Sequence, residues 1–198
     1  MAKYTSYVTV SHSTYDEWQT NTNGNGYDVD SPNGHGCQCW DLISLFYYNI
    51  GFPAGYPILT NSAMYTMWNN RSQNVAYGGV TYFDLITNVN NIKKGDIIVF
   101  NYTASNPYGH AGFATVNYND WTPDPSDPYE FPILSQNNGG TPDPDGGSYT
   151  NIHGYDIRLF LGAFRFKAWQ PTPTPISRKV SKTKFPFFIT ANKRRGSW

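Results

Sequence analysis

The segment CQCWDLISLFYYNIGF, residues 37–52, joins two cysteines to an apolar run of helical pattern. Most of its large apolar side chains fall on one broad helical face, which is typical of a helix packed on a core. Asp41 falls in the first turn, where a negative charge complements the helix dipole. Gly51 and Pro53 end the pattern. The segment therefore predicts a buried helix that begins at Cys39.

The sequence on either side of this segment predicts helices first and strands later. Residues 13–20 (STYDEWQT) have the pattern of a short capped helix, and residues 62–69 predict another. Four strands are predicted after these helices, within residues 94–102, 109–118, 131–138 and 156–166. Residues 119–130 and 139–151 are rich in Pro, Asp or Gly and are predicted to be loops. This order predicts an α+β fold, in which N-terminal helices pack on an antiparallel β-sheet.

Charge is distributed unevenly along the chain, although the formal net charge is zero. Residues 1–168 carry all 14 acidic residues and a net charge of −7, whereas residues 169–198 carry +7. The PTPTP stretch at residues 171–175 predicts a stiff, extended linker. We therefore expect one folded domain over residues 1–168, followed by a Pro-rich linker and a basic tail over residues 169–198. Such a tail can attract an anionic partner or dock on a protein subunit.

Secreted and membrane-spanning proteins are not indicated. The N-terminal residues MAKYTSYVTV lack an apolar run with a cleavage site, so no signal peptide is predicted. No stretch approaches the roughly 18 consecutive apolar residues that cross a bilayer, so no membrane span is predicted. Cys37 and Cys39 are too close in sequence for an unstrained disulfide, so a disulfide framework is not expected either.

Cys39 is the candidate nucleophile, because the dipole at the start of a helix favours the thiolate and lowers the pKa of a thiol. A thiolate needs a base partner, and the sequence offers four histidines: His12, His35, His110 and His153. His110 begins a predicted strand among small residues, so another side chain can approach its ring closely. His153, in a predicted loop, is the alternative base. An amide from residues 135–138 (SQNN) can orient the ring.

Four short motifs occur in the order found in a known family. They are GCQCWDL at residues 36–42, GDIIVF at 95–100, GHAGF at 109–113 and ILSQN at 133–137. Together they resemble the CHAP domain, a papain-like cysteine amidohydrolase and peptidase of NlpC/P60 type that is common in bacteriophage lysins. The resemblance covers roughly residues 13–167 and implies a papain-like CHAP fold.

The resemblance implies catalytic roles for four residues of this chain. They are the nucleophile Cys39, the base His110, the orienting residue Asn137 and the oxyanion-hole donor Gln38. Cys37 has no catalytic counterpart in the family. Ser135 is a departure, because many members carry Glu at this position and a serine cannot supply the carboxylate charge. The expected catalytic set is therefore a Cys-His-Asn triad.

Many phage members of the family also bind calcium in the loop before the cysteine. The matching oxygen ligands in this chain are the carboxylates of Asp28, Asp30 and Asp41, with Asn33 as a neutral ligand. Calcium takes about six to eight oxygens, and Pro32 interrupts the alternation of ligands. Without a metal, Asp28 and Asp30 are simply turn residues. The resemblance thus implies no required cofactor and a structural Ca²⁺ as an option.

The function that the resemblance implies is that of a bacteriophage peptidoglycan hydrolase, either an N-acetylmuramoyl-L-alanine amidase or a peptidoglycan endopeptidase. Bacterial peptidoglycan is the expected substrate, phage tail proteins are expected partners of the basic tail, and nucleic acid is not expected. Such a protein is expected in the virion tail, or in the host cytoplasm before its release to the cell wall. The alternative is a catalytically inactive, CHAP-like tail component that binds the wall or a partner subunit.

Overall fold

The computed structural model describes residues 1–31 and 35–170. Its helices are α1 (Tyr15–Thr22), α2 (Cys39–Asn49), α3 (Thr66–Asn69) and α4 (Arg71–Asn74), with short 3-10 turns at Val89–Asn91, Tyr118–Asp120, Ile157–Leu159 and Lys167–Trp169. Its strands are β1 (Lys3–Tyr4), β2 (Gly26–Tyr27), β3 (Ala76–Tyr77), β4 (Val80–Thr81), β5 (Phe83–Ile86), β6 (Ile97–Phe100), β7 (His110–Ala114), β8 (Glu130–Ser135), β9 (Asn151–Asp156) and β10 (Phe160–Phe166).

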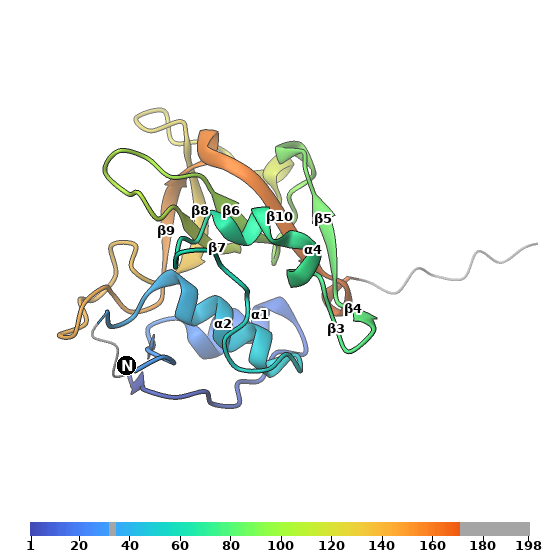
Figure 1. Ribbon diagram of the computed structural model, residues 1–198. Coiled ribbons are helices and arrows are strands. Elements are labelled where there is room, and N and C mark those ends of the chain that lie inside the picture. The colour runs from blue at the N-terminus through green and yellow to red at the C-terminus, as the bar shows by residue number, and fades with distance from the viewer. Residues whose placement is uncertain (32–34, 171–198) are drawn as a thin grey trace, which may run out of the picture.

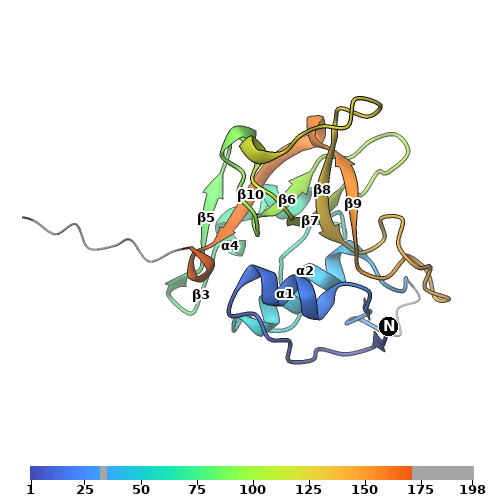
Figure 2. The ribbon, with the colours of Figure 1, turned by 180° about the vertical axis from the view of Figure 1, so that it is seen from behind.

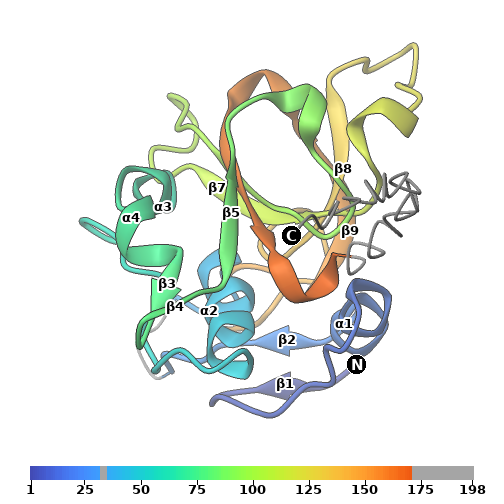
Figure 3. The ribbon, with the colours of Figure 1, turned by 90° about the vertical axis from the view of Figure 1, so that its right-hand side faces the viewer.

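One antiparallel sheet dominates the described part of the chain. Its six strands follow the order β5-β10-β6-β7-β8-β9. Helices α1 and α2 pack on one face of this sheet (Figures 1 and 2), and Figure 3 shows how strongly the sheet curves. The small pairs β1-β2 and β3-β4 lie outside it. The structure therefore confirms the predicted order of N-terminal helices followed by an antiparallel sheet.

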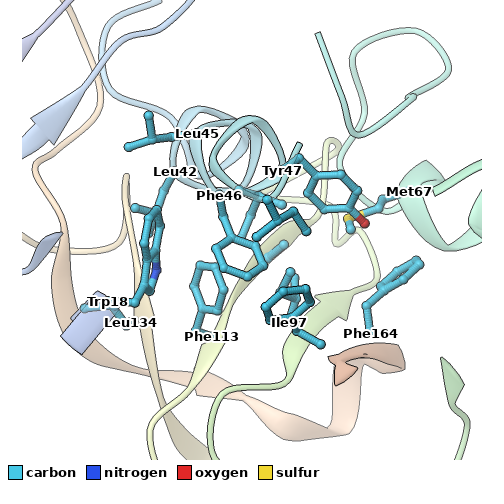
Figure 4. Close-up of a cluster of buried hydrophobic side chains, with 14 of the residues drawn as sticks. Trp18, Leu42, Leu45, Phe46, Tyr47, Met67, Ile97, Phe113, Leu134 and Phe164 are labelled. Atoms are coloured by element: carbon cyan, nitrogen blue, oxygen red, sulfur yellow. The ribbon is translucent and has the colours of Figure 1, made fainter. Parts of the chain in front are cut away.

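The apolar face of α2 packs on the sheet around Phe46 (Figure 4). Its ring centre lies 5.1 Å from that of Trp18 in α1 and 5.3 Å from that of Phe113 in β7. Trp169 lies beyond β10, and its ring centre is 4.8 Å from that of Phe46. A second apolar cluster, which includes Phe100, lies on the other face of the sheet, because successive strand residues point to opposite faces. Packing of the first cluster fixes α2 against β7, and the second cluster covers the opposite face of the sheet.

Each predicted strand is present, and the predicted helices are found with adjusted ends. Helix α2 begins at Cys39 as expected, and α1 begins after Thr14, whose hydroxyl accepts a hydrogen bond from the Glu17 N–H at 3.1 Å. The helix predicted over residues 62–69 shortens to α3, because Asn61 and Ser62 adopt positive φ angles in a turn. The last predicted strand begins later, at Phe160, after a 3-10 turn.

Two strands of the sheet were not predicted. Strand β5 pairs with β10 at one edge, and β9 pairs with β8 along its whole length at the other. The prediction that His153 lies in a loop is therefore wrong, since this residue is paired with Ile133 in β9. Residues 171–198, which hold most of the predicted linker and tail, lie outside the described residues. Among the helices that the structure describes, none has the length and apolar character needed to span a bilayer.

Candidate active site

Cys39 is the first residue of α2, and its thiol lies against the backbone of Ala111 in β7. The side chain remains partly exposed. Burial nevertheless raises the pKa of the thiol to about 11, opposed by contacts with the backbone of Ala111 and Trp40. The sequence predicted a lowered pKa from the helix dipole, and this prediction is wrong for the free protein because desolvation outweighs the dipole. At rest Cys39 is therefore a thiol.

His110 is the first residue of β7, and its ring is buried between two other side chains. Nε2 lies 3.1 Å from the Ser135 hydroxyl, and the ring stacks on Tyr155 with centres 4.6 Å apart and planes 15° apart. Burial lowers the pKa of His110 to about 3, so the imidazole is neutral. Because Ser135 occupies Nε2, Nδ1 is the ring nitrogen for which the described residues provide no hydrogen-bond partner.

Gly112 makes room for the contact between His110 and Ser135. A Cβ atom at residue 112 would lie 2.9 Å from the Ser135 Cβ and 2.8 Å from the Ile133 Cδ1, closer than real Cβ atoms come. In β7 and β8, Phe113 pairs with Leu134, so continuing that register places Gly112 opposite Ser135. His110 then lies diagonally across from Ser135 on the same face of the sheet. A glycine at this position allows the hydroxyl to reach the ring.

Cys39 and His110 approach the same place from α2 and β7. The thiol contacts the residue that follows His110. It also lies near Tyr155, whose pKa is raised chiefly by burial and further by Cys39 when that thiol is ionised. No hydrogen bond joins the thiol to the imidazole among the residues that the structure describes. Catalytic hydrogen bonds are often long in a free enzyme and shorten when substrate binds. The resting pair is a neutral thiol beside a neutral imidazole.

Gln38 and Asn137 bind each other rather than His110. The Asn137 side-chain amide donates to Gln38 Oε1 at 2.6 Å, and the Gln38 amide donates to the His35 carbonyl. Asn137 lies two residues beyond the end of β8 and has a positive φ of 55°. The contact with the imidazole that was predicted for Asn137 is made by Ser135. Within the described chain, Ser135 and Tyr155 are the ring contacts that the sequence did not assign.

Asp28, Asp30 and Asp41 converge below the start of α2, with carboxylate oxygens within 4.8 Å of one another. Asp41 is buried, and its two oxygens accept the Val29 N–H at 3.0 Å and the Gln38 N–H at 2.8 Å. Burial and the charges of Asp30 and Asp28 raise the pKa of Asp41 to about 8. Converging carboxylates that repel one another fit a divalent cation. Asn33, the fourth predicted ligand, lies outside the described residues.

A second acidic group shares Asp28 with the first and holds a lysine. Lys3 Nζ lies 2.8 Å from Asp143, 2.6 Å from Asp145 and 3.3 Å from Asp28. These contacts raise the pKa of Lys3 even though burial lowers it. Asp143 also accepts the N–H of the buried Cys37 at 3.0 Å. The ammonium group therefore neutralises this side of the acidic cluster, which the sequence did not reveal because residues 3 and 143 are far apart in the chain.

The other histidines lie elsewhere. His12 Nδ1 is 2.9 Å from the Val10 carbonyl oxygen, and its ring meets Phe46 edge-on with centres 6.4 Å apart. His35 is exposed in the loop before α2. His153 is exposed on β9, and a Cβ added to Gly139 would lie 3.5 Å from its ring. Of the four histidines, His110 is the one whose ring is buried with a hydroxyl partner beside the Cys39 helix.

No protein-family model matches the chain. The chain is 28% identical, over 178 residues that make up 89% of its length, to the D-alanyl-L-alanine endopeptidase of Streptococcus phage B30. It spans 35% of that relative, about a third of its length. Among solved structures, the wild-type endolysin LysIME-EF1 is similar with a TM-score of 0.51 and 20% identity, over 77% of this chain and 63% of that one. The structure of Ly7917 covers 81% of this chain and 63% of its own, with a TM-score of 0.46 and 17% identity. The chain thus resembles a phage endopeptidase in sequence and an endolysin in fold.

The raised pKa of Cys39 predicts how its alkylation by iodoacetamide depends on pH. Since only the thiolate reacts, the rate is expected to rise about a hundredfold between pH 7 and pH 9, well below a pKa of about 11. Labelling followed by mass spectrometry measures the rate at Cys39, and the buried Cys37 serves as an internal control. A rate that is already maximal at pH 7 would instead mean that the resting pair is a thiolate with an imidazolium.

Proposed function

We propose that this chain is a phage peptidoglycan hydrolase of the CHAP type, which cleaves an amide bond with Cys39 as nucleophile and His110 as base. The observation that carries the proposal is the position of Cys39 at the start of α2, where its thiol lies against β7. The first residue of β7 is the buried His110, whose ring is held by Ser135 from β8 and Tyr155 from β9. The sequence similarity to a phage endopeptidase over 89% of the chain supports it.

In the proposed reaction, His110 Nδ1 removes the thiol proton as the Cys39 sulfur attacks the carbonyl carbon of the amide. The imidazolium that forms returns the proton to the leaving amine when the C–N bond breaks. A thioester remains on Cys39, and a water molecule, deprotonated by the same ring, hydrolyses it. Because both groups are neutral at rest, proton transfer accompanies the attack rather than preceding it.

Ser135 positions the ring in this scheme. For Nδ1 to accept a proton, Nε2 must carry one, and the Ser135 oxygen at 3.1 Å accepts that N–H. The stacked Tyr155 ring prevents the imidazole from turning over. A hydroxyl supplies direction without charge, so it stabilises the imidazolium less than a carboxylate does.

Free backbone N–H groups at the start of α2 can stabilise the oxyanion. The first N–H groups of a helix have no partner within it, and those of Cys39 and Trp40 lie next to the sulfur. Gln38 is the proposed side-chain donor of this oxyanion hole. In the free protein its side-chain amide donates to the His35 carbonyl, and its side-chain oxygen accepts from Asn137. To donate to the substrate, Gln38 must therefore break its hydrogen bond with the His35 carbonyl.

The bond cleaved is either the N-acetylmuramoyl–L-alanine amide or a peptide bond of the stem or cross-bridge. The site of action is the bacterial wall, reached from the virion tail or from the infected cell. Phage tail proteins are the proposed partners of the basic C-terminal tail, and no cofactor takes part in the chemistry. Asp28, Asp30 and Asp41 would hold a structural Ca²⁺, which would offset their mutual repulsion at the start of α2.

Loss of activity in a cysteine variant tests the proposed nucleophile. Cys39→Ser should abolish lysis of Gram-positive cell walls in a zymogram, because oxygen is the poorer nucleophile and the ring is a weak base. Cys37→Ser is the matched control and should remain active, since Cys37 is buried beside Asp143. Lysis by the Cys39→Ser variant would contradict the mechanism. A wild-type protein that binds walls without cutting them would favour an inactive tail component.

Replacement of Ser135 tests the positioning of His110. Ser135→Ala should lower kcat by roughly tenfold to a hundredfold with little change in KM, because the ring loses its partner while the substrate contacts remain. Ser135→Thr keeps the hydroxyl and should restore most of the rate. The measurement is kcat and KM on soluble muropeptides as a function of pH. Equal rates for the Ala variant and the wild type would show that the hydroxyl does not orient the base.

Calcium should raise the melting temperature if the proposed ligands hold it. An ion that binds only the folded protein stabilises it by about 2.7 kcal/mol at a hundredfold excess over its Kd. The shift should grow from pH 6 to pH 9, because Asp41, with a pKa of about 8, must lose its proton to bind the ion. Asp30→Asn should abolish the shift, whereas Asp145→Asn, on the Lys3 side, should keep it. No shift with calcium or EDTA would rule out the metal.

A further inference from the structure

The loop between β6 and β7 leads directly into His110 (Figure 1), and it carries two tyrosines that are exposed to solvent. Tyr102 is 55% exposed and Tyr108 is 61% exposed, the two highest values among the Phe, Tyr and Trp side chains that the structure describes. Tyr108 is separated from His110 only by Gly109. Large aromatic rings that are left in water on one loop beside a reaction site mark a surface for binding.

Hydrogen bonds centred on Asn106 hold this loop in place. Its side-chain amide donates to the Gly109 carbonyl at 2.9 Å, and its side-chain oxygen accepts the Tyr108 N–H at 3.2 Å. The same amide lies 3.4 Å from the hydroxyl of Tyr155, the residue stacked on His110. The backbone that carries the tyrosines is thus tied to the ring of the proposed base. A surface ordered before its ligand arrives loses less entropy on binding.

A third ring completes the surface from a different part of the chain. The Tyr65 ring lies 5.1 Å from that of Tyr102, and the Tyr65 N–H donates to the Tyr108 carbonyl at 3.2 Å. Gly109 permits this approach, because it has a positive φ of 70° and an added Cβ would lie 3.0 Å from the Tyr65 Cβ and 3.2 Å from the Tyr65 backbone nitrogen. We call Tyr65, Tyr102 and Tyr108 the tyrosine ledge.

The chemistry of the tyrosine ledge selects its ligand. Residues 101–109 and 58–70 contain no charged side chain, so the ledge has no group that pairs with a phosphate or a carboxylate. It offers flat apolar faces, phenol hydroxyls, and the hydroxyls of Thr103 and Ser105. Flat apolar faces with hydroxyls around them complement a neutral sugar ring, which has an apolar C–H face and a polar rim.

We infer that the tyrosine ledge binds N-acetylated sugar rings of the glycan strand, next to the peptide that Cys39 cuts. This inference rests on the proposed function, because it takes peptidoglycan as the substrate and assigns its glycan part to this surface. Of the two candidate bonds, the N-acetylmuramoyl–L-alanine amide lies only a few bonds from the glycan, and a peptide bond of the stem lies on the same chain. Tyr108 is only two residues from His110. Binding there places the stem peptide at the nucleophile.

Binding of an uncharged oligosaccharide tests the tyrosine ledge without relying on catalysis. The probe is the tetramer of N-acetylglucosamine, titrated into the full chain by calorimetry or by chemical-shift mapping. The wild type should bind it, and a Tyr102→Ala/Tyr108→Ala variant should bind at least tenfold more weakly, which corresponds to about 1.4 kcal/mol. Tyr129→Ala is the matched control, because this tyrosine is 43% exposed on another loop. It should bind as the wild type does.

The outcomes separate this inference from the proposed function. No binding of the tetramer by the wild type, or equal binding by the double variant, would overturn the tyrosine ledge. Binding of a free stem peptide that is lost in the double variant, without binding of the sugar, would also overturn it. Cleavage of cell walls by the wild type is measured separately, so a protein that binds sugar but never cuts fails the proposed function alone. Thermal melting of each variant checks that the fold is intact.

Discussion

The carboxylate of Asp41 fixes the start of helix α2, and the candidate site depends on that start. One oxygen accepts the N–H of Gln38 and the other accepts the N–H of Val29, so the loop before the helix is tied to its first turn. Cys39 lies between these anchors and the apolar part of α2, which packs on β7 through Phe46 and Phe113. The position of the sulfur is therefore set from both sides, by a polar cap and by the core.

Burial keeps the Cys39 thiol and the His110 imidazole electrically neutral, and the hydrogen-bond partner of the imidazole is uncharged as well. A thiol with a pKa near 11 and an imidazole with a pKa near 3 exchange no proton at rest. A carboxylate beside such a ring would itself have to be buried, at a cost in desolvation. Ser135 avoids that cost because it is uncharged and fully buried. A serine at this position is thus consistent with the role proposed for His110, that of a base which would become charged only briefly, when substrate covers the site.

Features that short-range sequence patterns encode could be predicted from the sequence. Features that depend on which strands pair with one another could not. Helix α2 was predictable because its apolar face and Asp41 are local, and so were the apolar runs of β6 and β7. Strand β9 has exposed Ile152 and His153 and becomes a strand only through its pairing with β8, which no local pattern shows. Prediction of the candidate site from the sequence is limited in the same way. Cys39 and His110 follow from residue type and position, but the choice of Ser135 over Asn137 as ring partner depends on the register of two strands. Tyr155 was missed because it lies on the unpredicted β9.

A cluster of acidic side chains lies near the start of α2, and its negative charge is only partly balanced by a lysine. Lys3 neutralises Asp143, Asp145 and one side of Asp28, but no ammonium group reaches Asp30 or Asp41 within the described chain. Repulsion among Asp28, Asp30 and Asp41 therefore acts on the carboxylate that caps α2, and its raised pKa reflects this. When Asp41 takes up a proton, it accepts the Gln38 and Val29 N–H groups less strongly, because charge-assisted hydrogen bonds are the stronger ones. A cation held by these acids, as proposed above, would keep Asp41 ionised and the start of α2 rigid. Through that cap, an ion that takes no part in the chemistry would still determine where the sulfur of Cys39 lies.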